Sequence, residues 1–150
     1  MTNDWNSIGK ITLSEGCLIP PPTLPPHPGL YRLTFDDGSL YIGEANDIRR
    51  RIGDYLVYYP SVAIESEFRI NKKLLSSIKG TEVSVLVGDM FKEHSPRCIR
   101  EHAEIKAAKK EHVVLNGGRI EERIAFYISE IARLNKILEF KNQLNGVMHE

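Results

Sequence analysis

The sequence predicts a small α/β (α+β) fold: a three-stranded sheet of antiparallel or mixed strands flanked by helices, with one additional long carboxy-terminal helix. Two short segments rich in aromatic and branched residues, "GLYRLTF" and "SLYIGEA", surround an Asp-Gly pair and indicate a hairpin. The valine-rich segment "TEVSVLV" indicates a third, more buried strand. Elsewhere apolar side chains recur every three or four residues, as in amphipathic helices.

Composition limits the possible classes of protein. The chain has 150 residues, 41% of them hydrophobic, which suffices for one modest core. No stretch approaches the roughly 18 apolar residues of a membrane helix, and the first residues lack the order of a secretory signal, so we expect a cytoplasmic protein without membrane contact. Cys17 and Cys98 stand far apart and neither they nor the five histidines show metal-ligand spacing, which predicts reduced thiols and no zinc site.

The charge is balanced, because 20 basic residues match 20 acidic ones. That balance argues against a protein that coats nucleic acid through bulk positive charge. Contact with DNA would have to come from local clusters. Two such clusters are the arginine run at Arg49, Arg50 and Arg51 and the group Arg69, Lys72 and Lys73, although each, taken singly, is better explained as a solvated helix face.

The first element is an extended arm. Residues 1–27 form the first part of the predicted domain organisation, and six prolines fall within residues 20–28. Prolines at that density exclude a helix and favour a polyproline arm. We expect this arm to lead into the domain and to remain outside its core.

The hairpin comes next, with strands near 29–35 and 39–44 joined by a tight two-residue turn at Asp37-Gly38. Tyr31 and Tyr41 then stand at matching ends of neighbouring strands. Whether the two phenols share one face of the sheet depends on the register, which the sequence leaves open.

Three helices are predicted around the third strand. The first begins after a cap at Asn46 or Asp47 and aligns Ile48, Ile52 and Leu56 on one face. The second places Phe68, Leu74, Leu75 and Ile78 at helical intervals and stops at Gly80. The third begins at the Ser95-Pro96 pair and ends before "LNGG".

A final helix is predicted from Arg119 to about Gln143. Its apolar residues Ile124, Tyr127, Ile131, Leu134 and Leu138 are spaced by three and four, which makes a heptad seam. The seam would pair with a second copy in a homodimer or cover the protein's own sheet. Ile128 and Ile137 widen the apolar stripe, and this width favours packing on the sheet.

The arginine run is aimed at the hairpin. Arg51 follows Gly43 by eight residues, enough for a short loop and one helical turn to return its guanidinium to the sheet, and Tyr55 lies one further turn along the same face. A guanidinium beside phenols suits a phosphodiester, because it forks onto phosphate oxygens. Taken singly, the tyrosines are better explained as packing residues and the arginine as a solvated one; it is the combined spacing that favours a functional role.

These motifs in this order resemble the GIY-YIG nuclease family. The matching features are Gly29-Leu30-Tyr31, Tyr41-Ile42-Gly43, Arg51 with Tyr55, "IREHAEI" around Glu101, and "VVLNGG" around Asn116. Within the family, "PGLYRLTF…LYIGEANDIRRRIGDYL" is especially similar to the amino-terminal nuclease domain of bacterial nucleotide-excision-repair endonucleases. The resemblance covers residues 28–118 as a nuclease-like domain and leaves 119–150 as a helical extension.

The resemblance implies a metal-dependent endonuclease that hydrolyses DNA phosphodiester bonds, in repair or in restriction. Tyr31 would serve as or assist the general base, Tyr41 would position the nucleophile or the phosphate, and Arg51 would clamp the phosphate. Tyr55 would occupy a position where relatives carry tyrosine or histidine. Glu101 would be the single protein ligand of Mg²⁺ or Mn²⁺, with Glu104 as a competitor, and Asn116 would brace the site. DNA backbone contacts are expected at Arg49, Arg50, Arg69, Lys72 and Lys73.

Two features depart from the repair enzymes. Glu44 stands where they carry lysine, and a glutamate that faces the cleft would repel phosphate. The interval from Tyr55 to Glu101 is also longer than theirs. We interpret the change at Glu44 as a loss of repair-type identity and not of activity. The alternative function, from a different class, is a catalytically weak relative that binds DNA, or a partner protein through its helical tail.

Overall fold

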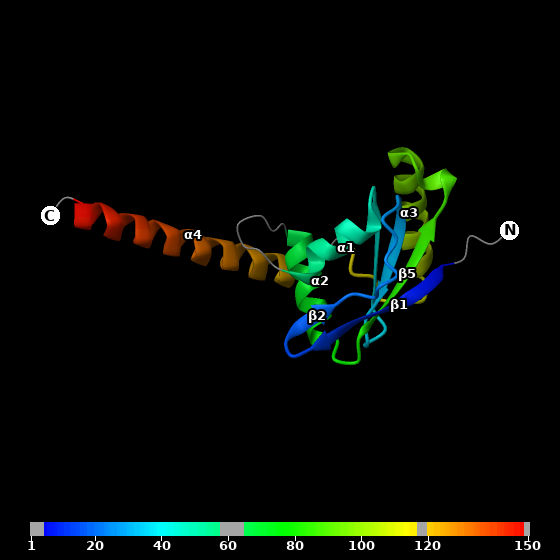
Figure 1. The fold of residues 1–150 in the computed structure, drawn as a ribbon, viewed down its shortest axis with the longest axis horizontal. Helices are drawn as coiled ribbons and strands as arrows, with labels where there is room; N and C mark the ends of the chain where they lie inside the picture. The colour runs from blue at the N-terminus through cyan, green and yellow to red at the C-terminus, as the bar shows by residue number, and fades with distance from the viewer. Residues whose placement is uncertain (1–4, 58–64, 117–119, 149–150) are drawn as a thin grey trace.

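The computed structural model describes residues 5–57, 65–116 and 120–148. Its elements in chain order are β1 (Asn6–Ser14), β2 (Cys17–Ile19), β3 (Gly29–Thr34), β4 (Leu40–Ala45), α1 (Ile48–Leu56), α2 (Glu65–Ser76), β5 (Thr81–Val87), the 3₁₀ helix η1 (Asp89–Phe91), α3 (His94–Ala108) and α4 (Ile120–Met148). The body of mixed α and β structure and the projecting α4 are visible in Figure 1.

The described residues form a sheet of five strands in the order β2-β1-β5-β3-β4, with every neighbouring pair antiparallel. The α/β class is as predicted, but the expected three strands are two too few. Both extra strands come from the amino-terminal segment, which was expected to remain outside the core. Instead, Ile11 of β1 is 2% exposed and Leu24 is 4% exposed, so that expectation is wrong. The proline run concealed the two strands that precede it.

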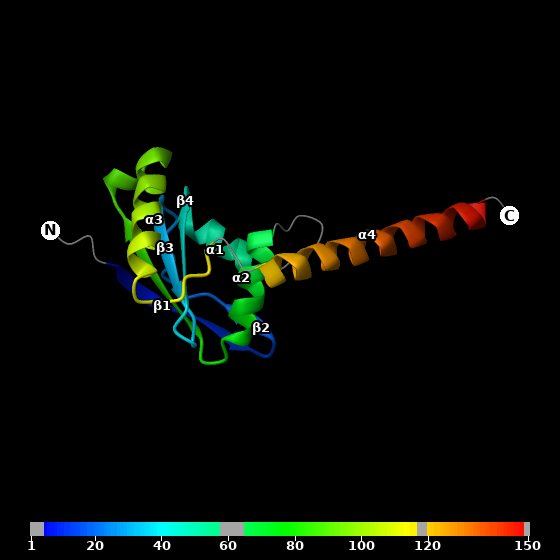
Figure 2. The same cartoon turned by 180° about the vertical axis from the view of Figure 1, so that it is seen from behind.

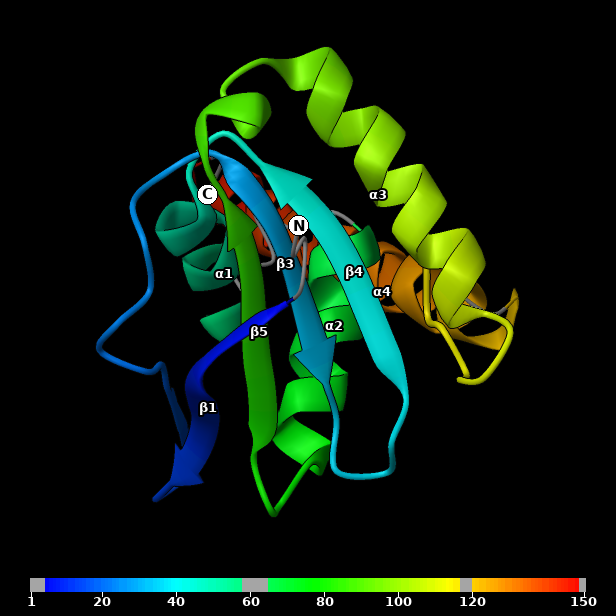
Figure 3. The same ribbon diagram turned by 90° about the vertical axis from the view of Figure 1, so that its right-hand side faces the viewer.

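Helices α1 and α2 cover one face of the sheet, whereas α3 runs beside β4 at the opposite side (Figures 2 and 3). The main core lies under α1 and α2. There Leu33 of β3 and Val83 of β5 meet Ile52 of α1 and Ile70 of α2, all fully buried. A smaller cluster of Leu30, Leu86 and Phe91 lies on the other face.

Local details differ from the sequence prediction at two elements. Phe35 N–H donates to the carbonyl of Ser39, so the hairpin loop consists of Asp36, Asp37 and Gly38. It is one residue longer than the expected two-residue turn. In α2 the predicted inward residues Leu75 and Ile78 are 41% and 80% exposed. The helix ends at Ser76, and it presents Phe68, Ile70 and Leu74 to the core instead.

Helix α4 extends away from the rest of the chain (Figures 1 and 2). Its Phe126 packs on Phe68 of α2 with ring centroids 5.6 Å apart. Beyond that contact the predicted seam is open, because Tyr127, Ile131, Leu134 and Leu138 are each more than half exposed. The expectation that the seam covers the sheet is therefore wrong. The predicted helix start at Arg119 and the side chain of Ile124 lie outside the described residues.

No helix in the described part of the chain combines the length and the apolar character that membrane spanning requires.

Candidate active site

Three tyrosines, from β3, β4 and α1, pack together between α1 and the sheet. Tyr31 lies on β3 opposite Gly43, and Tyr41 lies on β4 opposite Leu33, so the register puts both phenols on the same face as diagonal neighbours. Their ring centroids are 6.3 Å apart, and each lies 6.1 Å from the ring centroid of Tyr55 on α1. The Tyr31 and Tyr55 hydroxyl oxygens are 2.5 Å apart and share a hydrogen bond. The sequence left open whether the Tyr31 and Tyr41 phenols share one face of the sheet, and in the structure they do.

The two glycines of the motifs are explained by close packing. A Cβ on Gly43 would lie 2.3 Å from both Cζ and Oη of Tyr31. A Cβ on Gly29 would lie 2.2 Å from the carbonyl oxygen of Leu86 on β5. Neither distance is compatible with a side chain. Gly43 therefore makes room for the Tyr31 phenol, and Gly29 lets β3 approach β5.

Both buried phenols are held in the protonated form. Burial raises the pKa of Tyr31 above its ordinary value, with repulsion from Tyr41 adding to it, and the Tyr55 hydrogen bond and Arg51 oppose the rise without cancelling it. The pKa of Tyr55 is raised well above its ordinary value, first by burial and then by the Tyr31 phenol. A phenol is a general base only as phenolate, and at neutral pH this environment disfavours the phenolate.

Arg51 points from α1 over the tyrosines. Helix α1 begins where the Asp47 side chain accepts a hydrogen bond from Arg50 N–H, which is the predicted cap. One turn later the Arg51 guanidinium lies 4.8 Å from the Tyr55 ring centroid, and its Nη1 donates to Glu67 of α2 at 2.8 Å. Burial alone lowers the pKa of Arg51, but the nearby phenols and Glu67 outweigh it, so the pKa is raised and the cation persists.

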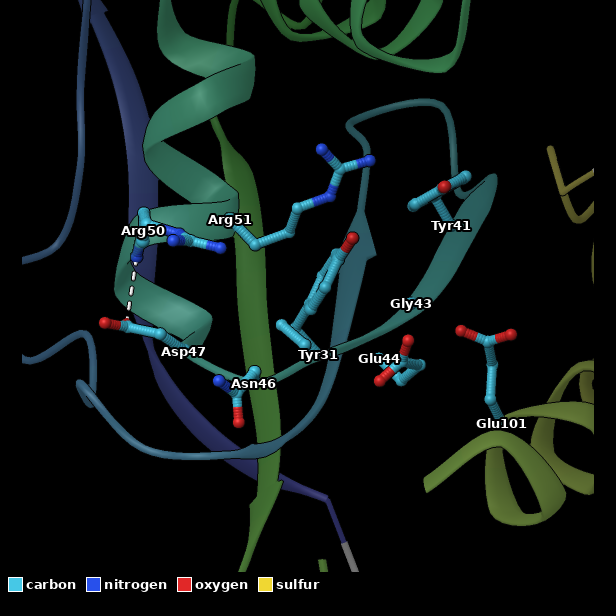
Figure 4. Close-up of a pocket in the computed structure, with 10 residues that line it drawn as sticks. Tyr31, Tyr41, Gly43, Glu44, Asn46, Asp47, Arg50, Arg51 and Glu101 are labelled. Carbon is cyan, nitrogen blue, oxygen red and sulfur yellow. Dashed lines mark hydrogen bonds between the residues drawn. The ribbon is translucent and has the colours of Figure 1, made fainter. Parts of the chain in front are cut away.

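Glu101 reaches the same place from the other side. It lines a cleft of about 390 Å³ together with Tyr31, Tyr41, Glu44, Arg50 and Arg51 (Figure 4). Burial, then repulsion from Glu44, raises the pKa of its carboxyl group above the ordinary value. The competitor Glu104 is engaged elsewhere, because it accepts hydrogen bonds from Arg100 Nε at 2.7 Å and from Trp5 Nε1 at 3.3 Å. Glu101 is accordingly the carboxylate of this helix that borders the cleft.

Asn116 braces β4 from outside the cleft. Its Oδ1 accepts a hydrogen bond from Ile42 N–H at 3.1 Å, and its Nδ2 donates to the Ile42 carbonyl at 2.6 Å. Neighbouring backbone bonds join Leu40 to Val113 and Leu115, so this segment runs beside β4 as a parallel bridge. The pairing fixes the strand between Tyr41 and Gly43, and a role of Asn116 in the chemistry of the site stays a prediction.

Glu44 borders the cleft, but its charge is paired. Its Oε2 accepts a hydrogen bond from Arg97 Nε at 2.8 Å. Arg97 is 4% exposed, and it also donates to the carbonyls of Phe91 and Lys92. The predicted repulsion of phosphate by Glu44 is therefore reduced by a buried arginine that the sequence did not connect to it.

The predicted DNA-binding residues do not form one surface. Arg50 is exposed and borders the cleft, whereas Arg49 Nε donates to the Leu24 carbonyl and holds the amino-terminal segment. Arg69 is 7% exposed, so it is not available on the surface as the prediction requires. Lys72 lies over the Phe68 ring, and Lys73 pairs with Asp37 beside the hairpin loop, away from the cleft.

Sequence reasoning missed one group of potential metal ligands. Glu44, His94 and Cys98 each offer one donor atom, and these atoms lie within 4.8 Å of one another. The prediction that no cysteine or histidine has ligand spacing is thus wrong. His94 and Cys98 are four residues apart and share a helix face, and this spacing is the signal that the sequence contained.

Comparison with known proteins finds a partial sequence similarity. A stretch of 83 residues is 35% identical to proteins named UvrABC system protein C from two strains of Porphyromonas gingivalis. The match covers 51% of this chain but only 13% of the length of those curated relatives. It is consistent with a GIY-YIG-related domain. No protein-family model matches the chain, and no solved structure matches it at a significant level.

Proposed function

We propose that this chain is a metal-dependent nuclease domain that hydrolyses DNA phosphodiester bonds in the cleft between α1 and α3. The observation that carries the proposal is the convergence of Tyr31, Tyr41, Arg51 and Glu101 on a single cleft of about 390 Å³. They come from four different elements separated by up to 70 residues of sequence. The similarity to UvrABC system protein C supports a repair-type rather than a restriction-type role.

Arg51 binds the scissile phosphate in this proposal. Its Nη1 donates to the Glu67 carboxylate at 2.8 Å, and a phosphate presents the same kind of oxygen acceptors to the guanidinium. Because the pKa of Arg51 is raised, the cation is available throughout the physiological range. Arg51 then stabilises negative charge that develops on the phosphate as the attacking oxygen approaches.

Tyr31 orients the attacking water. Its hydroxyl group shares a hydrogen bond with Tyr55, and when Tyr31 donates to Tyr55 its oxygen lone pair is free to accept a hydrogen bond from water. The raised pKa of Tyr31 makes this positioning role easier than proton abstraction by phenolate. Tyr41, 9% exposed at the cleft, would contact the nucleophile or the phosphate as the resemblance implies.

The donors around Glu101 fit a hard divalent cation. Glu101 borders the cleft with its carboxylate oxygens, and Mg²⁺ or Mn²⁺ prefers oxygen ligands. When bound, the cation would act as a Lewis acid and lower the pKa of a coordinated water. Glu101 would hold it, and Asn116 would keep β4 in register beneath it.

Nicking of supercoiled plasmid tests this proposal. We expect Mg²⁺-dependent conversion to the nicked form by the wild type, with branched, nicked and plain duplexes assayed in parallel. Arg51→Ala and Glu101→Ala should each slow the reaction by about 10²–10³-fold, as loss of a charge-stabilising group does. Lys106→Ala, an exposed residue of α3 that does not border the cleft, is the matched control and should cut normally. Intact substrates with all proteins, or equal cutting by all, would refute the enzymatic role.

A protein-interaction role is the second candidate, and the exposed apolar residues of α4 favour it. Tyr127, Ile128, Ile131, Leu134, Ile137, Leu138, Phe140 and Leu144 are between 48% and 63% exposed. The occupant we propose is a second copy of this chain in antiparallel pairing. A two-fold axis near Lys136 brings Glu130 opposite Lys141 and Arg133 opposite Glu139 of the second copy, so unlike charges meet.

Sedimentation equilibrium at micromolar concentration tests the homodimer. The wild type should have the mass of two chains, and Leu134→Glu should have the mass of one, because a charge at the centre of the seam cannot be buried without a partner. Ser129→Glu, a change at an exposed polar position of the same helix, is the control and should remain dimeric. A monomeric wild type would refute the homodimer proposal.

A further inference from the structure

A second group of ligand-type side chains lies at the start of α3. Glu44 extends from β4, and His94 and Cys98 stand one turn apart on α3. The group does not include Glu101. None of the steps assigned to the candidate active site uses His94 or Cys98.

The spacing of the donor atoms matches tetrahedral coordination. Bonds of roughly 2.0–2.3 Å to zinc place neighbouring ligand atoms roughly 3.3–3.8 Å apart. Cys98 Sγ lies 3.3 Å from His94 Nε2, and His94 Nε2 lies 3.6 Å from Glu44 Oε1. The third pair of donor atoms is within 4.8 Å, so a small rotation of one side chain completes the triangle.

The carboxylate is positioned by a buried second residue. Arg97 Nε donates to Oε2 of Glu44 at 2.8 Å, while Oε1 is the oxygen that faces His94. Arg97 is itself fixed by the backbone carbonyls of Phe91 and Lys92. Metal-ligating carboxylates are commonly held in this way by a hydrogen bond to the oxygen that does not bind the metal.

We propose that Glu44, His94 and Cys98 bind one divalent cation of the zinc class, with these three side chains as protein ligands and the fourth position open to solvent. Nitrogen and sulfur donors favour Zn²⁺ or Co²⁺ over the hard Mg²⁺ expected at Glu101. Binding replaces the Cys98 S–H bond with a sulfur–metal bond and releases the proton to solvent. His94 is exposed, so the cation has access from solution.

Cobalt spectroscopy of the metal-free full chain tests the site, and it needs no DNA. Titration with Co²⁺ under reducing conditions should produce a sulfur-to-cobalt charge-transfer band that saturates at one equivalent, and Zn²⁺ should displace it. Cys98→Ser should abolish the band. His94→Gln should weaken Zn²⁺ binding by more than about 100-fold, which is the upper end of the loss seen for outer-shell partners.

Matched controls come from the same chain. Cys17→Ser removes the other free cysteine, and His112→Gln removes an exposed histidine outside the group. Both should bind Co²⁺ and Zn²⁺ as the wild type does. Glu44→Gln should retain the charge-transfer band with at least about tenfold weaker affinity, because an amide oxygen is a poorer ligand than a carboxylate.

Three results would overturn the proposal: absence of the band from the wild type, its persistence in Cys98→Ser, or unchanged Zn²⁺ affinity in both His94→Gln and Glu44→Gln. Far-ultraviolet circular dichroism of each variant separates loss of a ligand from loss of the fold. Because the readout is spectroscopic, failure here leaves the nuclease proposal untouched, and failure of plasmid nicking leaves this site untouched.

Discussion

Replacing Gly43 with alanine is expected to destabilise the protein through a clash with one phenol. The new Cβ would lie 2.3 Å from Tyr31 Cζ and Oη, against the roughly 3.5–4.0 Å of an ordinary carbon contact, so the ring would have to move by more than about 1 Å. Tyr31 is 1% exposed and shares a hydrogen bond with Tyr55, which leaves it no space. Overpacking and the weakened hydrogen bond together cost about 2–4 kcal/mol in free energy of unfolding.

Urea unfolding followed by circular dichroism measures this cost, and two comparisons isolate its cause. In a Tyr31→Leu background the clashing atoms are absent, so Gly43→Ala should be neutral or stabilising by about 0.4–1 kcal/mol through the unfolded state. Gly53→Ala, on the exposed side of α1 with open space around its Cβ position, should stabilise the wild type by about 0.5–1 kcal/mol. Equal effects of Gly43→Ala in both backgrounds would refute the packing argument.

Three further predictions concern titrating groups. Burial, and then repulsion from Glu44, raises the pKa of Glu101, so metal-dependent activity should fall as the pH drops through that raised pKa. Glu44→Gln removes the repulsion and should move the acid limb of the pH–rate profile to lower pH. An acid limb at the same pH as in the wild type would contradict this. Asp37 has a lowered pKa, chiefly because of the Lys73 hydrogen bond, so it contributes stability above its unfolded pKa of about 3.9, and this stability is lost as the pH falls. In urea unfolding, the free energy of unfolding of Asp37→Asn should therefore fall less on acidification than that of the wild type. Tyr31 has a raised pKa, so the stability that it contributes is present below its unfolded pKa of about 10 and is lost as the pH rises. In urea unfolding at alkaline pH, the free energy of unfolding should fall less for Tyr31→Phe than for the wild type.

Local spacing in the sequence was enough to predict the parts of the cleft that lie on one element or on neighbouring ones. The Asp47 cap and the interval from Arg51 to Tyr55 are properties of a helix turn, and the structure has both. The shared face of Tyr31 and Tyr41 depends on strand register, which is set by the longer loop and by contacts with β5. Such contacts are distant in sequence and leave no local pattern.

Other features could be identified only from tertiary packing. Glu101 and Glu104 lie on the same turn of α3, and what distinguishes them is the engagement of Glu104 by Arg100 on the same helix and by Trp5, 99 residues away. The basic cluster in the sequence predicts that Arg69 is a surface cation, but its position on α2 buries it. Strand β1 was masked by the prolines that follow it, because composition averaged over residues 1–27 hides a nine-residue strand.

In the proposed site, Arg51 and Glu101 act on one phosphodiester from opposite sides of one cleft. The initial rate of plasmid nicking as a function of Mg²⁺ concentration tests it most directly. We predict that Glu101→Gln raises the Mg²⁺ concentration needed for half-maximal rate, whereas Arg51→Lys lowers the rate at saturating Mg²⁺ and leaves that concentration unchanged. If Glu101→Gln cuts with the Mg²⁺ dependence of the wild type, or Arg51→Lys with its rate, the two residues do not form the site described above.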